Sequence, residues 1–537
     1  MMMKVKIFLL TILLGCLVST MKASSLKNEE HYDICIYGAT SSGVIAAYTA
    51  KQMGRSVLLI ATDEHIGGLS SGGLGQTDIG NKQAIGGLSR DFYRRLGKIY
   101  EEEETWKFEP SAAAKVFDDY IKEAEIPIIF NKRIESVTKE NTQIKSVTLV
   151  NTYGSTRKKR YVTAKMFLDC TYEGDLLALA GVSYTVGRED NSVYGETYSG
   201  FQLPEYRKQS GYHQFPDGVS PYVNPEDPSS GLLWGISEKA ASPIGTGDDG
   251  VQAYNFRICL TDSVENMIPI TKPKGYDPKK YELLIRLFEA QPNDRKISSY
   301  FIWSRMPNRK TDVNNRGAFS TDMIGANYAW PEASFEERKK IFEEHLIYTK
   351  GLLYFYVSDK RVPDSLRNFV SQWGYPKDEY ISNKHFTPQL YIREGRRMIG
   401  EYVMTEHNCV GTEVVDDPVG MAAYGMDSHN IQRIVVDNMV KNEGNVEIHG
   451  FKPYPVSFRS ITPKRNECTN LLVPVSLSSS HIAFGSIRME PVFMLLGESA
   501  AIAAVQSIEE NKAVQDIDYR NLKNKLLERN QVLSVQQ

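Results

Sequence analysis

Cysteine, histidine and excess charge of either sign are all scarce in this chain of 537 residues. The six cysteines are scattered, and no C-x-x-C or H-x-x-x-H spacing indicates a metal site. A formal net charge of −3 gives no electrostatic attraction to nucleic acid or to an anionic membrane. No internal repeat or low-complexity tract is evident. The composition therefore argues against a nucleic-acid-binding protein and is typical of a large soluble enzyme.

The apolar run at the N-terminus, residues 7–18, is too short to span a bilayer comfortably. Lys4 and Lys6 precede it, so residues 1–23 are typical of a signal peptide that is cleaved near Ala23. Residues 13–16, Leu-Leu-Gly-Cys, also resemble a bacterial lipobox, which would place a lipid anchor on Cys16. Because two apolar residues follow this cysteine, we favour soluble export. We expect an exported protein of the periplasm or cell surface, with the lipoprotein as the alternative.

The first motif after this leader predicts a βαβ unit. Residues 34–37 and 57–60 are short apolar runs typical of buried strands, and an apolar helix between them ends at Gly54. The turn before the helix carries the predicted contacts to a dinucleotide pyrophosphate, which are Gly38, Thr40, Ser41, Ser42 and Gly43. The two glycines permit a tight turn and close helix packing, while free helix N–H groups face the phosphates.

This fingerprint lacks two of its usual residues. Thr40 stands where the middle glycine of G-x-G-x-x-G is expected. The acidic residue that usually closes the second strand is also missing, since Ala61 and Thr62 stand there and Asp63 and Glu64 follow. Taken alone, the motif therefore leaves an ordinary strand-turn-helix open.

The next segment, HIGGLSSGGLG at residues 65–75, resembles the glycine-pair segment of two-dinucleotide-binding flavoproteins. This resemblance points to FAD and predicts further cofactor contacts at Gly67, Gly68, Leu69, Ser70 and Gly73. The same residues match G-x-S-x-G, the nucleophile elbow of hydrolases. That motif requires a strand before the serine and a helix after it, whereas we expect a loop followed by more glycines, so we reject a hydrolase.

Further elements of a flavoprotein domain follow. Ser111 is predicted to cap a helix over residues 112–125, which leads into a third parallel strand at 126–130. Alternating segments at 134–138, 144–150 and 160–163 predict an antiparallel excursion. Residues 165–175, KMFLDCTYEGD, predict a buried strand that ends in a glycine-acid turn. This element looks like the A-T-G-D-G-D motif that lies under FAD, which implies a cofactor contact at Asp175.

The last third predicts the other half of the cofactor site. Residues 470–475 resemble a strand, 476–485 a polar loop, and an apolar helix follows to about residue 506. Pro491 suits the first turn of that helix. In the glutathione-reductase-like superfamily such a helix points its N-terminus at the flavin, where its dipole stabilises negative charge. Arg488, Met489 and Pro491 are therefore predicted to contact the cofactor, and a helix that merely packs is the alternative.

Nearly the whole mature chain resembles bacterial FAD-dependent oxidoreductases with a glutathione-reductase-like FAD domain, which are common in Bacteroidetes. The resemblance rests on the glycine motifs and on later motifs such as VGREDNSVYGE, MPNRKTDVNN, YIREGRRMIGEYVMTEHN and LLVPVSLSSSHIAFGSIRMEP. It implies an α/β fold in which a Rossmann FAD-binding domain carries an inserted α+β substrate domain. The expected boundaries are residues 30–200 and 426–537 for the FAD domain and 201–425 for the insertion.

The substrate is indicated only by residue types. Four of the five tryptophans lie between residues 200 and 400, among polar side chains that would suit a carbohydrate, although most of these aromatics are expected to be core. Oxidation of a hydroxyl needs a base near the carbinol proton while hydride passes to FAD and then to an unidentified acceptor. The candidate catalytic residues are His429, His481 and Arg257. Arg393 and Arg397 are expected to share one face of a helix.

Two other functions stay open. A fumarate-reductase-like enzyme would reduce an activated C=C bond, with arginines holding a carboxylate and delivering the proton. A non-catalytic glycan-binding protein would keep FAD as a structural group.

Overall fold

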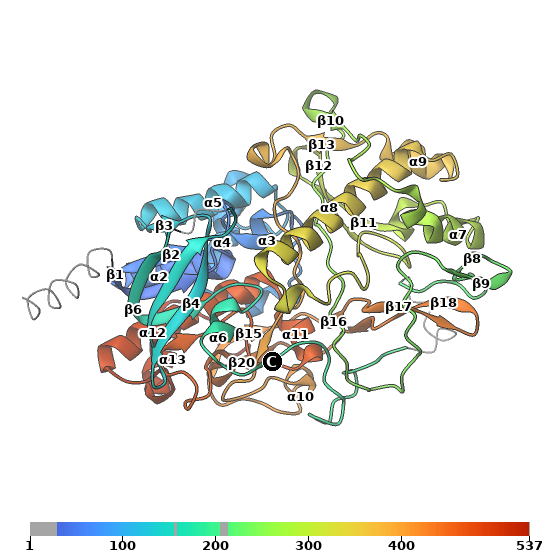
Figure 1. Ribbon diagram of the computed structural model, residues 1–537. Helices are drawn as coiled ribbons and strands as arrows, with labels where there is room; N and C mark the ends of the chain where they lie inside the picture. The colour runs from blue at the N-terminus through green and yellow to red at the C-terminus, as the bar shows by residue number, and fades with distance from the viewer. Residues whose placement is uncertain (1–28, 155–157, 204–212, 536–537) are drawn as a thin grey trace, which may run out of the picture.

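The structure is a computed structural model that describes residues 29–154, 158–203 and 213–535 (Figure 1). The predicted leader, with Cys16 and Ala23, lies outside the described residues.

A seven-stranded sheet occupies one end of the molecule (left in Figure 1). The strands run in the order β3-β2-β1-β6-β5-β4, and β21 also pairs with β6. Strands β3, β2, β1, β6 and β21 are parallel, whereas β4, β5 and β6 form an antiparallel excursion. The bounds are β1 (Glu29–Tyr37), β2 (Val57–Ile60), β3 (Ile128–Ile129), β4 (Lys132–Glu140), β5 (Gln143–Asn151), β6 (Arg160–Asp169) and β21 (Leu471–Leu472).

The two faces of this sheet contact different layers because successive strand residues point to opposite sides. On β1, Ile34 and Ile36 belong to the main core with the helices, while Cys35 and Tyr37 belong to a second cluster with β4, β5 and α6. The helices of this region are α2 (Ser41–Gln52), α3 (Gly68–Ser71), α4 (Gly87–Ile99), α5 (Pro110–Glu123), α6 (Asp175–Leu179), α11 (His481–Ile487), α12 (Glu490–Glu510) and α13 (Tyr519–Glu528).

Helix α12 runs through the centre of this core. Among the described residues it is the one helix long and apolar enough to cross a membrane, and 94% of its apolar stretch is buried inside the protein. It packs along α2, so the first and last parts of the chain form one core.

A separate hydrophobic core holds the middle of the chain. Its buried residues run from Phe215 to Ile392, together with Val440. The long helix α8 (Phe335–Ser358) crosses the centre of the molecule in Figure 1, and α7 (Glu282–Ala290) and α9 (Asp364–Val370) lie beyond it. From Met404 onward most of the buried apolar residues belong to the first core again, about twenty residues before the expected boundary at 425. The domain boundaries themselves stay predictions.

The other strands form short antiparallel pairs. They are β7 (Tyr184–Thr185) with β14 (Arg397–Met398), β8 (Tyr222–Asn224) with β9 (Asp227–Leu232), β10 (Met267–Pro269) with β13 (Gly374–Pro376), β11 (Phe301–Met306) with β12 (Lys310–Asn315), β15 (Pro418–Ala422) with β20 (Tyr454–Ser457), β16 (Met426–Ser428) with β19 (Val446–Ile448) and β17 (Gln432–Val436) with β18 (Met439–Glu443). The short helix α10 (Glu406–Val410) lies among them.

Several predicted boundaries were wrong. Helix α5 begins at Pro110 with Glu109 as its N-cap, so Ser111 is not the cap. A proline in the first turn is already set for helical backbone, and the Glu379 carboxylate accepts hydrogen bonds from the backbone and hydroxyl of Ser111. The third parallel strand is only Ile128–Ile129. The predicted loop 476–485 is cut short by α11, which Ser480 caps through its side chain.

Two other expectations were also wrong. Residues 160–163 and 165–169 form one continuous strand, β6, because its first half pairs with β5 while its whole length pairs with β1. Arg393 and Arg397 do not share a helix: residues 393–396 are irregular and Arg397 begins β14. Their guanidinium groups form separate buried ion pairs, which an extended backbone can separate.

Candidate functional site

The turn between β1 and α2 is built around its two glycines. Gly38 has a φ of +103°, and a Cβ there would lie 2.7 Å from the carbonyl carbon of Cys170. A Cβ on Gly43 would lie 1.9 Å from the Gly38 carbonyl oxygen. Side chains at these positions would therefore push α2 away from the ends of β1 and β6.

Thr40, at the position of the missing glycine, is the N-cap of α2. Its hydroxyl donates to the Cys170 carbonyl at 2.7 Å and accepts from the Gly43 N–H at 3.3 Å. The threonine thus joins the turn to the end of β6. The first backbone N–H groups of α2 have no acceptor within the helix, which leaves this end suited to an anion.

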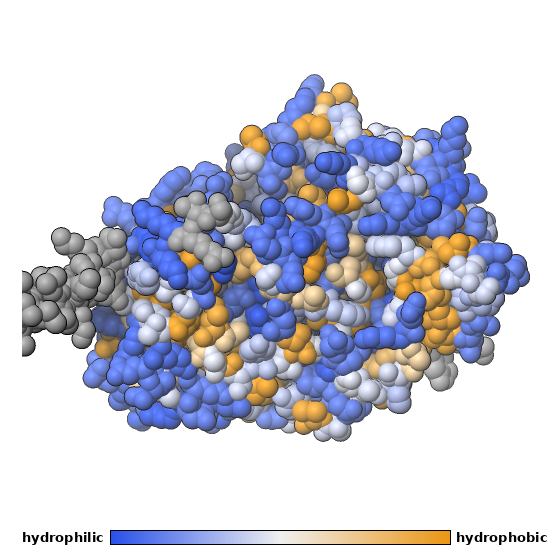
Figure 2. Space-filling model, viewed as in Figure 1, coloured by the Kyte–Doolittle hydropathy of each residue, from blue (hydrophilic) through white to orange (hydrophobic). Residues whose placement is uncertain are grey.

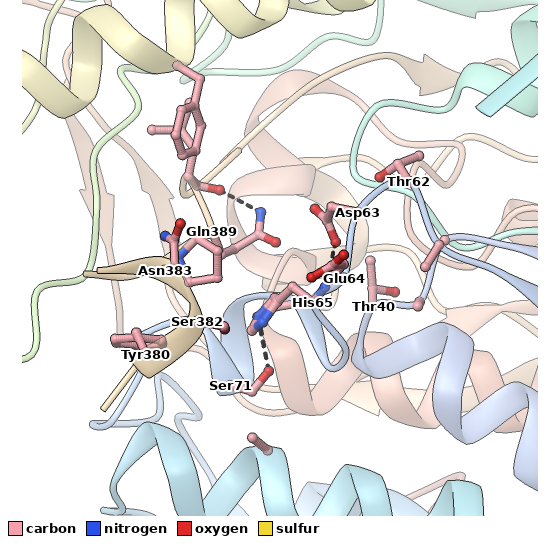
Figure 3. A pocket seen from close by; sticks show the side chains of 18 of the residues that line it. Thr40, Thr62, Asp63, Glu64, His65, Ser71, Tyr380, Ser382, Asn383 and Gln389 are labelled. Carbon is pink, nitrogen blue, oxygen red and sulfur yellow. Dashed lines mark hydrogen bonds between the residues drawn. The ribbon is translucent and has the colours of Figure 1, made fainter. Parts of the chain in front are cut away.

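A cavity of about 1250 Å³ opens at this turn. Gly38, Ala39 and Thr40 form one wall, and α8 and residues 378–392 contribute the opposite side. Figure 3 shows Thr62, Asp63 and Glu64, just after β2, beside Thr40 and His65. The exposed carboxylates of Asp63 and Glu64 supply acceptors for ribose hydroxyls that the end of β2 itself lacks. Figure 2, in the view of Figure 1, shows a mostly hydrophilic face on which apolar residues gather toward the right side, near β8 and β9.

The glycine-pair segment lies against this turn. The Gly67 N–H donates to the Ala39 carbonyl at 2.8 Å, and Gly68 and Ser71 line the cavity. A Cβ on Gly68 would lie 2.2 Å from the hydroxyl oxygen of Tyr172. A Cβ on Gly73 would lie 2.2 Å from a backbone oxygen of the middle region, that of Arg257. A side chain at either position would collide with Tyr172 or with the Arg257 backbone, so glycine is required where these segments meet the glycine-pair segment.

The serine of the G-x-S-x-G match is buried rather than exposed at an elbow. Ser70 lies inside α3 and donates to Glu490 at 2.7 Å, and Ser41 donates to the same oxygen at 2.6 Å. Tyr172 donates to the other carboxylate oxygen at 2.6 Å and accepts from the Leu69 N–H. Burial raises the pKa of Glu490, and these hydrogen bonds oppose the rise. The carboxylate joins the N-terminal ends of α2, α3 and α12.

The other predicted cofactor contacts take different places. Asp175 lines the cavity but pairs with Arg338 at 2.6 Å and with Arg396 at 2.8 Å. Met489 is the N-cap of α12, and the Pro491 carbonyl accepts from Ser89. Neither residue lines the cavity, and the same is true of Ser41, Ser42 and Arg488. Their contacts with a cofactor stay predictions.

His429 lies in a second, largely buried polar cluster. Its Nδ1 is 2.7 Å from Asp322 Oδ2, and its Nε2 is 3.7 Å from Asp427 Oδ2. The side chain keeps 13% of its surface exposed. Burial lowers the pKa of His429, Arg393 lowers it further, and the charges of Asp322 and Asp427 oppose this. The imidazole is therefore neutral at pH 7 and can accept a proton at Nε2.

Two arginines and two tyrosines complete the cluster. Arg393 pairs with Asp322 at 3.0 Å, and its guanidinium lies 4.6 Å from the centre of the Tyr391 ring. Arg488 donates to the Tyr391 hydroxyl at 2.7 Å and to the Asp427 carbonyl at 2.9 Å. The charge of Asp78 is the largest cause of a raised pKa at Tyr424, followed by burial and Asp427. Tyr391 packs with Leu69 and Leu74 against Tyr172, which lines the cavity, so the two regions adjoin.

His481 and Arg257, the other two candidate catalytic residues, have their polar atoms engaged. The His481 ring binds Ser428 Oγ through Nε2 at 3.0 Å and Glu394 through Nδ1 at 2.8 Å. Arg257 is buried and binds both Asp312 and Asp78. His481 is connected to the His429 cluster by its hydrogen bond with Ser428. Arg257 is connected to the same cluster by its ion pair with Asp78. Their catalytic roles stay predictions.

The tryptophans of the middle region belong to its hydrophobic core. Trp330 and Trp373 are buried in it, and Trp234 and Trp303 pack against it. This matches the expectation that most of these aromatics are scaffold. Residues that the sequence did not single out are Asp78, Asp322, Tyr391 and Tyr424. Asp78 and Asp322 reach the cluster from segments far from His429 in the sequence, whereas Tyr391 and Tyr424 lie close to Arg393 and Asp427.

The residues present at the cavity fit an ADP-containing flavin. The glycine turn permits close approach of a pyrophosphate, the N-terminus of α2 faces it, and carboxylates lie at the end where a ribose would be held.

None of the curated proteins matches this chain. Solved structures that resemble parts of it include the anhydrotetracycline hydroxylase OxyS from Streptomyces rimosus, with 11% identity over 30% of this chain and 36% of that one and a TM-score of 0.22. A flavoprotein/dehydrogenase from Cytophaga hutchinsonii is 13% identical over 29% of this chain and 43% of that one, with a TM-score of 0.22. L-proline dehydrogenase from P. horikoshii is 14% identical over 30% of this chain and 59% of that one, with a TM-score of 0.24. The similarity thus spans about a third of this chain, and TM-scores this low say nothing of its substrate.

The family comparison covers far more of the chain. The model of the FAD dependent oxidoreductase family matches residues 33–526, from the first strand of the sheet to α13. The protein therefore belongs to the FAD-dependent oxidoreductases, with FAD as its cofactor.

Proposed function

We propose that this oxidoreductase oxidises a hydroxyl group of a carbohydrate or a related small polar molecule. The observation that carries the proposal is the His429–Asp322 pair, in which Asp322 holds Nδ1 while Nε2 stays without a hydrogen-bond partner among the described residues. A carboxylate that binds one ring nitrogen fixes the tautomer, so that the other nitrogen can act as a base.

The proposed reaction balances with these groups. FAD, when bound, would supply the acceptor for the hydride that leaves the carbinol carbon. His429 Nε2 takes the hydroxyl proton, the C–O single bond becomes a carbonyl, and Asp322 stabilises the imidazolium that forms. An external acceptor, which is not identified, then removes the two electrons.

The surroundings of His429 support a substrate with several hydroxyl groups. Asp427 and Asp78 are partly exposed, with side-chain exposures of 17% and 27%. Each uses one carboxylate oxygen to bind an arginine, at Arg488 and Arg257 respectively. Their remaining oxygens can accept hydrogen bonds from hydroxyls. Paired acceptors beside a base suit a polyol better than an apolar molecule.

A second candidate function has one observation in its favour. Arg393 and Arg488 are both fully buried, and the Nε of each has no hydrogen-bond partner among the described residues. Buried arginine donors can hold a carboxylate, as a C=C reductase of enoates requires. The charges of Asp322 and Asp427 beside them make this less favourable for an anion.

Anaerobic spectroscopy of the purified holoprotein separates the two functions. The flavin absorbance is followed after addition of monosaccharides, oligosaccharides, polyols or hydroxy acids. Bleaching by a hydroxyl compound supports the proposal. Reoxidation of chemically reduced protein by an enoate, without bleaching by any hydroxyl compound, supports the second candidate instead.

We also propose export, for which the support is the apolar run after Lys4 and Lys6. N-terminal sequencing of the native protein tests it. A mature chain that begins after Ala23, or at a lipidated Cys16, agrees with export, whereas a full-length chain in the cytosol contradicts both.

A further inference from the structure

One carboxyl group on the cavity wall has almost no protein partner. Glu173 follows Tyr172 in the turn after β6, and both residues line the cavity with Gly38 and Thr40. Its Oε1 accepts one long hydrogen bond, 3.3 Å, from Trp330 Nε1. Among the described residues, Oε2 has no hydrogen-bond partner and no cation within ion-pair distance. This oxygen is therefore available to a ligand that fills the cavity, and such a ligand would have to hydrogen-bond it or leave the group protonated.

The charged groups around Glu173 do not neutralise it. Arg338 from α8 and Arg396 both bind the neighbouring Asp175 carboxylate. Arg396 also donates to Glu173, but to its backbone carbonyl. Asp175 and Asp169, on the same side of the sheet, add negative charge, and the phenol groups of Tyr254 and Tyr153 also lie near Glu173.

These surroundings shift the pKa of the Glu173 carboxyl group in the protein without cofactor. Burial raises the pKa of Glu173 to about 7; Arg338 and the Trp330 hydrogen bond oppose the rise, whereas Asp175 and Asp169 add to it. A ligand that displaces water from the cavity removes the remaining solvation of the carboxylate and raises the pKa further. A neutral carboxylic acid would then have an O–H to donate.

We propose that Glu173 takes up one proton when FAD fills the cavity and holds the cofactor as a neutral hydrogen-bonding group. Its contact would be with a polar group of the flavin half, such as a ribityl hydroxyl or a ring carbonyl. An ionised carboxylate could not donate a hydrogen bond to a ring carbonyl, and the pyrophosphate in the same cavity would repel its charge. Glu173 is thus a positioning residue for the cofactor.

The test is the pH dependence of FAD binding between pH 6 and 9. Diluted holoprotein is brought to equilibrium at each pH, and released FAD is measured by its fluorescence. The uptake of one proton on binding predicts that the dissociation constant rises by up to about tenfold per pH unit above the pKa of the free group. Calorimetry of FAD binding to apoprotein, in buffers of different ionisation enthalpy, should show the same proton uptake.

Two variants test whether Glu173 is the group that takes up the proton. Glu173→Gln, which resembles the neutral acid, should bind FAD with a dissociation constant that no longer depends on pH. Glu343→Gln, a change at another exposed carboxylate that lines the cavity, should keep the wild-type slope. The proposal is overturned if wild-type binding is independent of pH, if Glu173→Gln keeps the slope, or if Glu173→Gln loses FAD at every pH, which would show that the ionised form is needed. Repeating the titration with ADP, which lacks the flavin half, should remove the slope, and an unchanged slope would contradict a flavin-side contact.

Discussion

His429 and Asp322, 107 residues apart in the sequence, meet at a distance of 2.7 Å between Nδ1 and Oδ2. Asp322 is also the ion-pair partner of the buried Arg393. Its pKa is lowered to about 2: burial raises it, but Arg393 and His429 outweigh that effect. The carboxylate therefore stays ionised and fixes the orientation of the imidazole across the pH range in which a histidine titrates.

Replacing His429 by alanine should slow flavin reduction by roughly 10²-fold or more, the usual loss for a general base. FAD content and the circular dichroism spectrum should stay unchanged, because the ring binds no residue of the cofactor cavity. Single-turnover reduction under anaerobic conditions measures this. The matched control is His407→Ala, since His407 binds the Tyr194 carbonyl outside the cluster, and it should reduce at the wild-type rate. A dead His481→Ala beside a normal His429→Ala would reverse the assignment.

Asp322→Asn should change both the height and the position of the pH–rate profile. The base works only when neutral, so the wild-type rate falls as pH drops through the pKa of His429, which lies below its usual 6.5. The charge of Asp322 raises that pKa. Without it, the acid limb should move to lower pH, while the plateau rate falls because the ring loses its orientation. An acid limb that moves to higher pH would show that Asp322 does not act on the titrating group.

The glycine turn was predictable from the sequence because its causes are local. Gly38 and Gly43 lie five residues apart, and each has a steric reason within the same βαβ unit or the strand beside it. The family motifs likewise identified FAD as the cofactor. Thr40 looked like a defect in the motif, yet it caps α2 with a hydrogen bond that a glycine lacks.

Much of the polar cluster and of the Glu490 site could not be predicted, because long-range pairing leaves no local pattern. Ser41 and Glu490 are separated by 449 residues. The spacing of Arg393 and Arg397 suggested a helix, but their partners are Asp322 for the first and Glu394 and Glu189 for the second. Asp322 and Glu189 lie on other segments of the chain, and a rule based on spacing along one helix does not include such partners.

Gly43→Val should yield apoprotein or misfolded protein, since a Cβ at this position would lie 1.9 Å from the Gly38 carbonyl oxygen. The flavin absorbance per chain after purification measures the loss. Gly54→Asn is the control, because this glycine also has a positive φ, of +77°, but nothing lies within 4 Å of its Cβ position. Asparagine tolerates such a backbone, so this variant should stay yellow. A Gly43→Val protein with full FAD content would show that the packing of the turn is not required.

Glu490→Ala should lower the free energy of unfolding by about 3 kcal/mol, because it leaves the hydroxyls of Ser41, Ser70 and Tyr172 without their acceptor. Glu490→Gln keeps one carbonyl oxygen and should cost less. Urea unfolding of the holoproteins gives both values. A change below about 0.5 kcal/mol for the alanine variant, the scale of surface substitutions, would mean that the carboxylate does not stabilise the junction of α2, α3 and α12.

The central claim is that hydride leaves a carbinol carbon while His429 accepts the hydroxyl proton. The most direct measurement is the anaerobic rate of flavin bleaching with the best hydroxyl substrate, compared with the same substrate carrying deuterium on the carbinol carbon. Bleaching of the wild-type flavin should be slower with the deuterated substrate, and either substrate should bleach the flavin of His429→Ala at least roughly 10²-fold more slowly. A wild-type flavin that no hydroxyl compound bleaches, but that an enoate reoxidises after chemical reduction, would contradict it.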